Sequence, residues 1–295
     1  MLSNNIYAED RIPNQWVRAW QNYRKNTRAM FGLWSLLLLL LVTIAAPWLS
    51  PYSATQQLPD LLLAPSWHPD GKIDLFFGTD DLGRDMYSRL VLGTRYTFGS
   101  AILVTVIAAT IGITIGVLAG MTKGLLSSTL NHILDTIMSI PSLLLALITI
   151  TFLGEGLAQV MFAVCLALIP RFIRAIYTAV HLEMEKDYII AARLDGASNF
   201  YLLYHSILPN VIATMVSEIS RAISVSILDI AALGFLGLGA LSPLPEWGTM
   251  LGEALDLTYI APWTVTLPGI AITVCVITIN LVGDGLRQAI IAGVD

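Results

Sequence analysis

Charged residues, cysteines and catalytic clusters are all scarce in this chain of 295 residues. Asp, Glu, Lys and Arg make up only 13% of it, whereas a soluble domain usually carries about 25%. Its two cysteines, Cys165 and Cys275, form neither a CxxC pair nor a Cys/His cluster, so a disulfide scaffold and a metal site have no support. The sequence has no GxxxxGK[ST] run to cradle a nucleotide phosphate, and its net charge of −5 gives nucleic-acid binding no support.

Long apolar runs are what the sequence does contain. Hydrophobic residues make up 56% of the chain, and they gather in blocks that reach the roughly 20 helical residues a bilayer requires. The first block is predicted to be an uncleaved anchor, because Pro47 stands where a signal peptide would be cleaved. We therefore predict an all-α integral membrane protein with about six transmembrane helices, near residues 31–50, 97–120, 130–152, 157–180, 210–238 and 263–290.

The distribution of Lys and Arg predicts the orientation. A cytoplasmic N-terminus puts most of the 16 basic residues on the cytoplasmic side, as the positive-inside rule requires. Both termini are then cytoplasmic, with a tail over 1–30 and a membrane domain over 31–290, divided into a first span (31–50), an outward segment (51–96) and a five-span core (97–290). The basic residues on that side are Arg11, Arg18, Arg24, Lys25, Arg28, Lys123, Arg171, Arg174, Lys186, Arg193 and Arg287.

Two short segments beside the first span suggest helices of their own. In the tail, Trp16 and Trp20 alternate with basic residues, which fits either an amphipathic helix on the membrane surface or an ordinary stop-transfer flank. In the outward segment, residues 79–93 are predicted to form an amphipathic helix with Thr79 or Asp80 as its N-cap.

The second span carries glycines at a four-residue spacing, Gly112, Gly116 and Gly120. Small residues on one stripe of a membrane helix let a neighbouring helix approach closely. We predict a packing seam at this stripe and not a ligand contact.

The connection between the fourth and fifth spans is too long to be a plain loop. It predicts a helix over 183–194, a break at Gly196 with positive φ, and a second short helix capped by Ser198. Pro209 then stands in the first turn of the fifth span. The pattern fits a docking element or a connecting hairpin, and the residue pattern alone does not decide between them.

The stretch AARLDGAS, followed by SILPN, resembles the "EAA" loop of permease subunits of binding-protein-dependent ABC importers. In that family the loop forms coupling helices that dock onto the ATPase subunit. Ile190 stands where the general motif has Glu, a departure that is common in the peptide-importer branch. The resemblance carries the coupling role over to Ala191, Ala192, Asp195, Gly196, Leu208 and Pro209.

Two further stretches, residues 77–95 and 233–254, resemble the dipeptide and oligopeptide C-type permeases, and in particular the "sensitivity to antimicrobial peptides" (Sap) branch. The resemblance implies a type I ABC importer permease fold in a bacterial inner membrane. It also implies a second homologous permease chain, two ATPase subunits that bind the ATP, and an extracytoplasmic binding protein. The chain itself would hold no cofactor and catalyse nothing. Its cargo would be a peptide, with haem and polyamines such as putrescine left open.

Three ionisable residues lie within the predicted fifth span. Glu218 and Arg221 are spaced to pair on one helix face, and Asp229 has no basic residue within a turn of it along the sequence. Because charges inside a span cost roughly 2.5–3.5 kcal/mol each, they usually face an interior or a cavity. They either line a path for cationic cargo or fix a subunit contact, and both interpretations remain open at this point.

Two rival classes of membrane protein fit the sequence less well. A self-sufficient secondary transporter or channel would show inverted repeats and helices interrupted at the midplane, and the sequence predicts neither. A membrane enzyme would need a nucleophile, base or metal cluster facing a pocket, and none assembles from the sequence.

Overall fold

The computed structural model describes residues 15–122 and 125–294, and within these ranges every regular element is a helix. Five helices are long and apolar enough to span a membrane, or six if one bent pair counts as a span, so the predicted all-α membrane fold is confirmed. Arg11 and Lys123, which entered the orientation argument, lie outside the described residues. The α-helices are α1 (Gln15–Lys25), α2 (Thr27–Leu49), α3 (Met86–Thr94), α4 (Ser100–Gly120), α5 (Leu125–Met138), α6 (Ser142–Leu153), α7 (Leu157–Met184), α8 (Asp187–Leu194), α9 (Asn199–Leu202), α10 (Leu208–Phe235), α11 (Trp247–Glu253) and α12 (Trp263–Val294).

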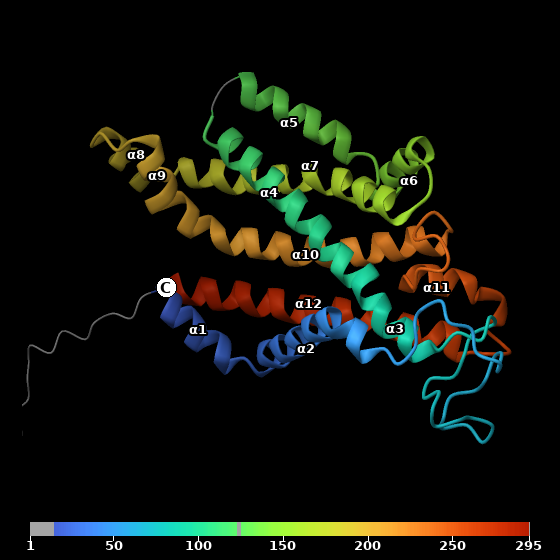
Figure 1. Cartoon of the computed structure of the whole chain (residues 1–295). Coiled ribbons are helices and arrows are strands. Elements are labelled where there is room, and N and C mark those ends of the chain that lie inside the picture. The colour runs from blue at the N-terminus through green and yellow to red at the C-terminus, as the bar shows by residue number, and fades with distance from the viewer. Residues whose placement is uncertain (1–14, 123–124, 295) are drawn as a thin grey trace, which may run out of the picture.

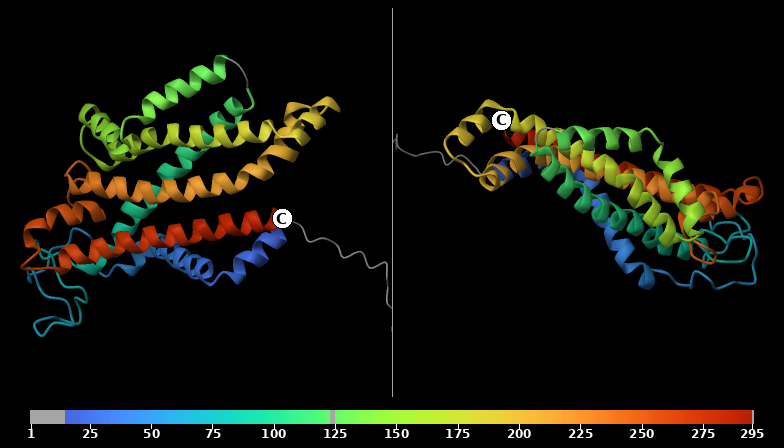
Figure 2. Two further views of the ribbon diagram at one scale, coloured as in Figure 1. Left: turned by 180° about the vertical axis from the view of Figure 1, so that it is seen from behind. Right: turned by 90° about the horizontal axis from the view of Figure 1, so that it is seen from above.

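The long helices α7, α10 and α12 run side by side, and α4 crosses them at a steep angle (Figure 1). One end of this bundle carries α1, the α8–α9 hairpin and the C-terminal end of α12, and we call it the hairpin end (Figures 1 and 2). The opposite end, the loop end, carries segment 51–85 and α11. The segments predicted to face outward, 51–85 and α11, therefore lie together at one end, and the α8–α9 hairpin lies at the other.

The glycine stripe of α4 packs directly against α7, as the spacing predicts. A Cβ added to Gly116 would lie 2.9 Å from the Cβ of Ile176, and one added to Gly120 would lie 2.8 Å from the Cβ of Val180. Real Cβ atoms essentially never come so close, so only glycine permits this helix spacing.

The third span is broken, which the sequence analysis did not predict. It consists of α5 and α6, which meet at an angle of 83° across Ser139, Ile140 and Pro141. Proline has no N–H to donate, and it disfavours helical geometry at the residue before it, so the helix stops before Pro141 and restarts after it. The sequence analysis missed this break because the residues on both sides of it are mostly apolar.

The predicted N-cap of the outward amphipathic helix was wrong. The helix begins at Met86, and its N-cap is Asp85, whose carboxylate accepts a hydrogen bond from Ser88 N at 2.8 Å. The hydroxyl of Thr79 instead donates to the carbonyl of Asp60 and accepts from Leu63 N, both at 2.8 Å. From Met86 the helix continues through a π-helical turn (Arg95–Gly99) into α4, so the outward helix and the second span form one continuous element.

The N-terminal tail turns sharply into the first span. Asn26 separates α1 from α2 and caps α2, because its side chain accepts hydrogen bonds from Arg28 N at 3.1 Å and Ala29 N at 3.2 Å. Tyr23 is buried in this corner and donates a hydrogen bond from its hydroxyl to the carbonyl of Ala29 at 2.9 Å. The corner packs on α12 at Gly285, where a larger residue would meet both Tyr23 and Ala29.

Candidate functional site

A polar groove runs between α10 and α12 in the half of the bundle nearest the hairpin end. It has a volume of about 600 Å³. Both helices are apolar enough to span a membrane, yet their facing sides are almost entirely polar here. We call the four charged residues among them the groove charges: Glu218, Arg221, Asp284 and Arg287. The lining is Thr214, Ser217, Glu218, Ser220, Arg221, Asn280, Gly283, Asp284 and Arg287.

Glu218 and Arg221 form the pair that their spacing predicts, but the pair is loose. Arg221 Nη1 lies 3.6 Å from Glu218 Oε1, and 73% of the Arg221 side chain is exposed. A guanidinium facing lipid at this depth would cost a few kcal/mol, so this face requires water or another polypeptide in front of it.

Asp229 has a basic neighbour that the sequence did not reveal. Arg171 from α7 faces its carboxylate, as does the side chain of Ser142, the first residue of α6. Arg171 also lines a small hollow together with Glu218 and Arg221. A line of opposite charges therefore extends from the groove to the break in the third span. Asp229 therefore has a basic neighbour from another helix, and Arg171 lies midway along α7, inside a candidate span and not in its flank.

The same side of α10 becomes apolar toward the loop end. Arg221, Leu228 and Phe235 recur every seven residues and form one exposed stripe. Beyond the polar groove, an apolar hollow of about 440 Å³ lies between α10 and α12 and is lined by Leu228, Phe235 and Ile272, among others. One helix face thus offers a polar half and an apolar half.

The connection between α7 and α10 forms the predicted hairpin, with two corrections. Gly196 has φ +88°, and Ser198 caps the second helix by accepting from Tyr201 N at 3.2 Å, both as predicted. The first helix does not start at Glu183, because α7 ends at Met184 and α8 begins at Asp187. The second short helix is not separate from the fifth span, because the helix is continuous from Asn199 through the π-helical turn Leu203–Ile207 into α10. Pro209 stands in the first turn of α10, as predicted.

The hairpin is anchored by one face and exposes another. Ile189, Leu202 and Ile207 are fully buried against the ends of α4, α7 and α10. On the other face, Leu194 is 84% exposed and Phe200 is 70% exposed. The six residues of the predicted coupling set lie together here: Ala191 and Asp195 are exposed, Gly196 forms the turn, and Ala192, Leu208 and Pro209 are half-buried.

A tyrosine hydroxyl ties the hairpin to both of its flanking spans. Tyr188 of α8 donates to the carboxylate of Glu183 at the end of α7, and it accepts from Asn210 Nδ2 at the start of α10, at 2.9 Å. Lys186 Nζ lies 2.8 Å from the other oxygen of the Glu183 carboxylate. Burial and the bond to Glu183 raise the pKa of Tyr188 to about 12. The hydroxyl therefore stays protonated and joins three helices at the base of the hairpin.

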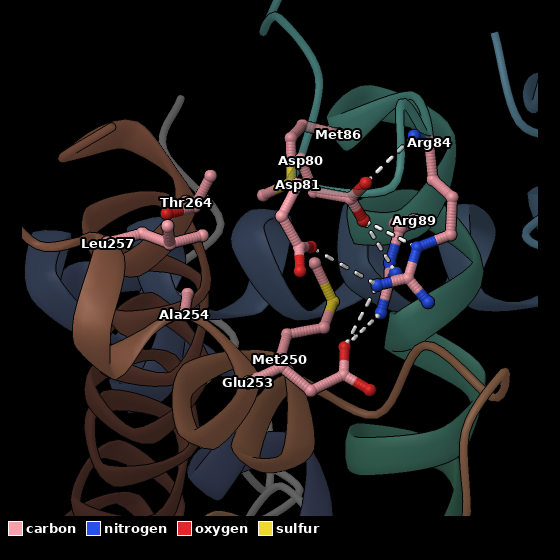
Figure 3. A pocket seen from close by; sticks show the side chains of 10 residues that line it. All are labelled: Asp80, Asp81, Arg84, Met86, Arg89, Met250, Glu253, Ala254, Leu257 and Thr264. Atoms are coloured by element: carbon pink, nitrogen blue, oxygen red, sulfur yellow. Dashed lines mark hydrogen bonds and ion pairs between the residues drawn. The ribbon is translucent and has the colours of Figure 1, made fainter. Parts of the chain in front are cut away.

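The loop end carries a second set of four charges, which we call the clamp cluster: Asp80, Arg84, Arg89 and Glu253 (Figure 3). Asp80 Oδ2 lies 2.6 Å from Arg84 Nε and 2.7 Å from Arg89 Nη1, while Glu253 Oε2 accepts from both guanidiniums at 3.1 and 3.0 Å. Arg84 is 3% exposed and Arg89 1% exposed. The cluster fastens the outward segment to α11.

The other end of α11 is fastened as well. Glu246, its N-cap, is fully buried and accepts from Gly248 N, Thr249 N and the hydroxyls of Thr97 and Thr249. Burial raises the pKa of Glu246, and these four hydrogen bonds oppose that shift. Trp247 adds a bond from its indole N–H to the carbonyl of Leu90 at 3.0 Å. The outward segment and α11 therefore form one rigid unit.

Sequence reasoning identified Glu218, Arg221 and Asp229 but missed Arg171, Asn280, Asp284 and Arg287 as members of the same polar region. A signal was present for the α12 residues, because Asn280, Asp284 and Arg287 recur at four and three residues within a predicted span. No local signal identifies Arg171, whose electrostatic interaction with Asp229 joins residues 58 positions apart in sequence.

Comparison with protein families gives two matches that together cover most of the chain. Residues 112–295 match the family described as "Binding-protein-dependent transport system inner membrane component". Residues 14–65 match the "N-terminal TM domain of oligopeptide transport permease C".

Curated relatives and solved structures are similar over long stretches. "Peptide transport system permease protein SapC" of Salmonella typhimurium is 54% identical over 296 residues, with 100% of each chain covered. "Dipeptide transport system permease protein DppC" of Escherichia coli K12 is 43% identical over 272 residues, covering 92% of this chain and 91% of that one. A chain of the MetNI methionine ABC transporter in an inward-facing conformation matches with a TM-score of 0.57 at 22% identity, covering 70% of this chain and 97% of that one. At that identity the likeness concerns the fold alone.

Proposed function

Since this chain belongs to the family of binding-protein-dependent transport system inner membrane components, in the SapC branch of the peptide permeases, we propose that it forms one side of a peptide translocation path and couples that path to separate ATPase subunits. One observation carries the proposal. The four groove charges lie within spans, and they face an open groove and not the protein interior. Lipid would not tolerate them, so water, cargo or a second permease chain faces this side of α10 and α12.

A second homologous permease chain fits the exposed stripe of α10. Its apolar half, at Leu228 and Phe235, would pack against the partner near the loop end. Its polar half would leave a water-filled vestibule between the two chains near the hairpin end. The apolar half of this helix face would therefore close the path near the loop end, and the polar half would leave it open near the hairpin end.

The hairpin is the proposed docking site for an ATPase subunit, which would bind the ATP. Leu194 and Phe200 project from a hairpin whose other face is packed on three spans. A movement of the ATPase subunit would therefore displace α7 and α10 together with the hairpin. The proposed coupling residues are Ala191, Ala192, Asp195, Gly196, Leu208 and Pro209.

This docking site fixes the proposed orientation, with the hairpin end and both termini in the cytoplasm of a bacterium and the loop end facing a binding protein. Cysteines introduced at Asp70 and Leu241, both exposed at the loop end, should react with an impermeant thiol reagent in spheroplasts, and one at Ala197 should not. Labelling of position 197 from outside would contradict this orientation.

We propose that the cargo is a peptide and that its preferred charge depends on the balance of positive and negative side chains along the path. The groove charges comprise two carboxylates and two guanidiniums, and Asp229 faces Arg171. This arrangement suits a peptide, which carries groups of both signs, better than it suits a polyamine.

The rival class of secondary transporter was expected to have interrupted helices, and the break at Pro141 is one such feature. The family assignment decides against that class.

Thiol accessibility in the groove tests the path directly. In a chain whose Cys165 and Cys275 are replaced by alanine, cysteines at Ser217 and Asn280 should react with a charged maleimide from the cytoplasmic side, and a transported peptide should protect them. A cysteine at Leu38, an exposed residue on the first span, is the matched control and should stay unlabelled because lipid covers it. If the groove cysteines do not react, or if the peptide does not protect them, the translocation path does not run along this face of α10 and α12.

A further inference from the structure

A second polar pocket lies at the hairpin end, where α1 turns into α2 against α12. Its volume is about 480 Å³. Lys25, Thr27 and Arg28 line it from the α1–α2 corner, and Asp284 and Gln288 line it from α12. The pocket shares Asp284 with the groove, and its other lining residues belong neither to the groove nor to the hairpin.

The pocket has an unbalanced positive charge. Lys25 and Arg28 form no ion pair with any residue the structure describes, and both are exposed. The chain has no acidic residue between Asp10 and Asp60, so nothing nearby in sequence neutralises them. Asp284 contributes the single carboxylate of the lining, which leaves a net charge of about +1.

The pocket sits where phospholipid headgroups lie. It is at the foot of α2, a candidate membrane span whose side chains Phe31, Trp34 and Leu38 are exposed along its length. On the other side of the corner, Trp20 of α1 is half exposed, and tryptophan is enriched at the membrane–water boundary. A headgroup in the pocket would have its acyl chains beside the apolar surface of α2.

We propose that this pocket binds the phosphodiester of an anionic phospholipid, such as phosphatidylglycerol. A phosphodiester carries one negative charge, which matches the net charge of the pocket, and Lys25, Arg28 and the Thr27 hydroxyl supply donors to its oxygens. Zwitterionic phosphatidylcholine has the same phosphodiester with its charge cancelled, so it should bind more weakly. The bound lipid holds α1 in its packed position against α12. The site does not depend on which cargo the chain transports.

Native mass spectrometry of the detergent-purified transporter complex, titrated with phosphatidylglycerol or phosphatidylcholine, tests the site. Arg28→Gln should lower the affinity for phosphatidylglycerol about fivefold, and Lys25→Gln with Arg28→Gln more. Arg24→Gln is the matched control, since Arg24 is an equally exposed cation at the same corner that does not line the pocket. It should leave the affinity unchanged.

A variant that should bind the lipid more tightly makes the test independent of misfolding. Asp284→Asn removes the carboxylate from the pocket and should strengthen phosphatidylglycerol binding, a gain that damage to the fold does not produce. Equal losses for Arg24→Gln and Arg28→Gln, equal binding of the two lipids, or no gain for Asp284→Asn would each overturn the proposal. Displacement of phosphatidylglycerol by millimolar inorganic phosphate would assign the pocket to free phosphate and would also overturn it.

Discussion

The clamp cluster and the groove charges contain the same chemistry, two carboxylates and two guanidiniums, in opposite settings. In the clamp cluster, Arg89 is 1% exposed and each carboxylate contacts both guanidiniums within 3.1 Å. In the groove, Arg221 has one carboxylate at 3.6 Å and a side chain that is 73% exposed. Charges that satisfy one another stabilise a fold, whereas charges left open are available to water, cargo or a partner chain.

The comparison separates the two ends of the molecule. At the loop end, hydrogen bonds at Glu246 and ion pairs at Glu253 satisfy the charges within one chain. Toward the hairpin end, the Arg221 side chain is mostly exposed, and Leu194 and Phe200 are exposed as well. We infer that the charges of the loop end hold the fold, whereas the exposed groups toward the hairpin end are available to partners.

Replacing Arg89 with alanine should have the largest effect on stability. It removes one guanidinium from the buried carboxylate of Asp80 and from the partly exposed carboxylate of Glu253, and breaking a buried ion pair such as Arg89–Asp80 costs about 3–5 kcal/mol. Arg221→Ala, at the exposed position, should cost less than about 1 kcal/mol. Thermal unfolding of both variants in detergent measures the contrast, and equal shifts in Tm would remove the distinction between the two sets of charges.

Replacing Gly196 with valine should uncouple the transporter without unfolding it. An added Cβ would meet no atom within 4 Å, so the whole effect comes from the φ of +88°, which costs a β-branched residue about 1–3 kcal/mol. We expect ATP hydrolysis per peptide transported to rise severalfold while the ATPase subunits still co-purify. Gly196→Asn is the matched control, since asparagine tolerates this conformation, and it should keep coupling near its normal value.

The sequence supports the spans, the glycine seam and the Gly196 hairpin because each depends on local pattern. Apolar length predicts a span, four-residue spacing predicts the seam, and glycine beside a capping serine predicts the turn. The break at Pro141 was missed because apolar composition continues across it, and the N-cap was misplaced because Thr79 bonds to residues 16 and 19 positions away. Electrostatic interactions across helices, such as that of Arg171 with Asp229, leave no local pattern in the sequence.

Replacing Tyr188 with phenylalanine should weaken coupling by a smaller factor. It keeps the ring but removes the bonds to Glu183 and Asn210, and each ordinary hydrogen bond contributes about 0.5–1.5 kcal/mol. Peptide transport per ATP should fall a few-fold with only a small fall in Tm, and Tyr259→Phe, at a 98% exposed outward residue, should change neither. An unchanged ratio would confine the hydroxyl to a local structural role.

The raised pKa of Tyr188 adds a pH dependence of known sign. The unfolded phenol titrates near its ordinary pKa of about 10, whereas the folded pKa is about 12. Its contribution to stability is therefore constant below pH 10 and is lost between about 10 and 12. The difference in Tm between the native chain and Tyr188→Phe should follow that profile, and a difference that disappears below pH 9 would place the titrating group elsewhere.

The smallest expected effect concerns cargo charge at Asp229. Asp229→Asn keeps the size of the side chain and leaves Arg171 with an unmatched positive charge, so uptake of a Lys-rich peptide should fall relative to a neutral peptide by about fivefold, or ~1 kcal/mol. Arg171→Gln should move the ratio the other way, and the double variant should restore it, because it removes both charges together. Transport in vesicles at matched protein levels measures the three ratios. If Asp229 and Arg171 are only a structural pair, each single variant should lower the uptake of both peptides equally. The charged residues between the groove and the broken third span would then stabilise the fold, as the clamp cluster does, and would not select cargo.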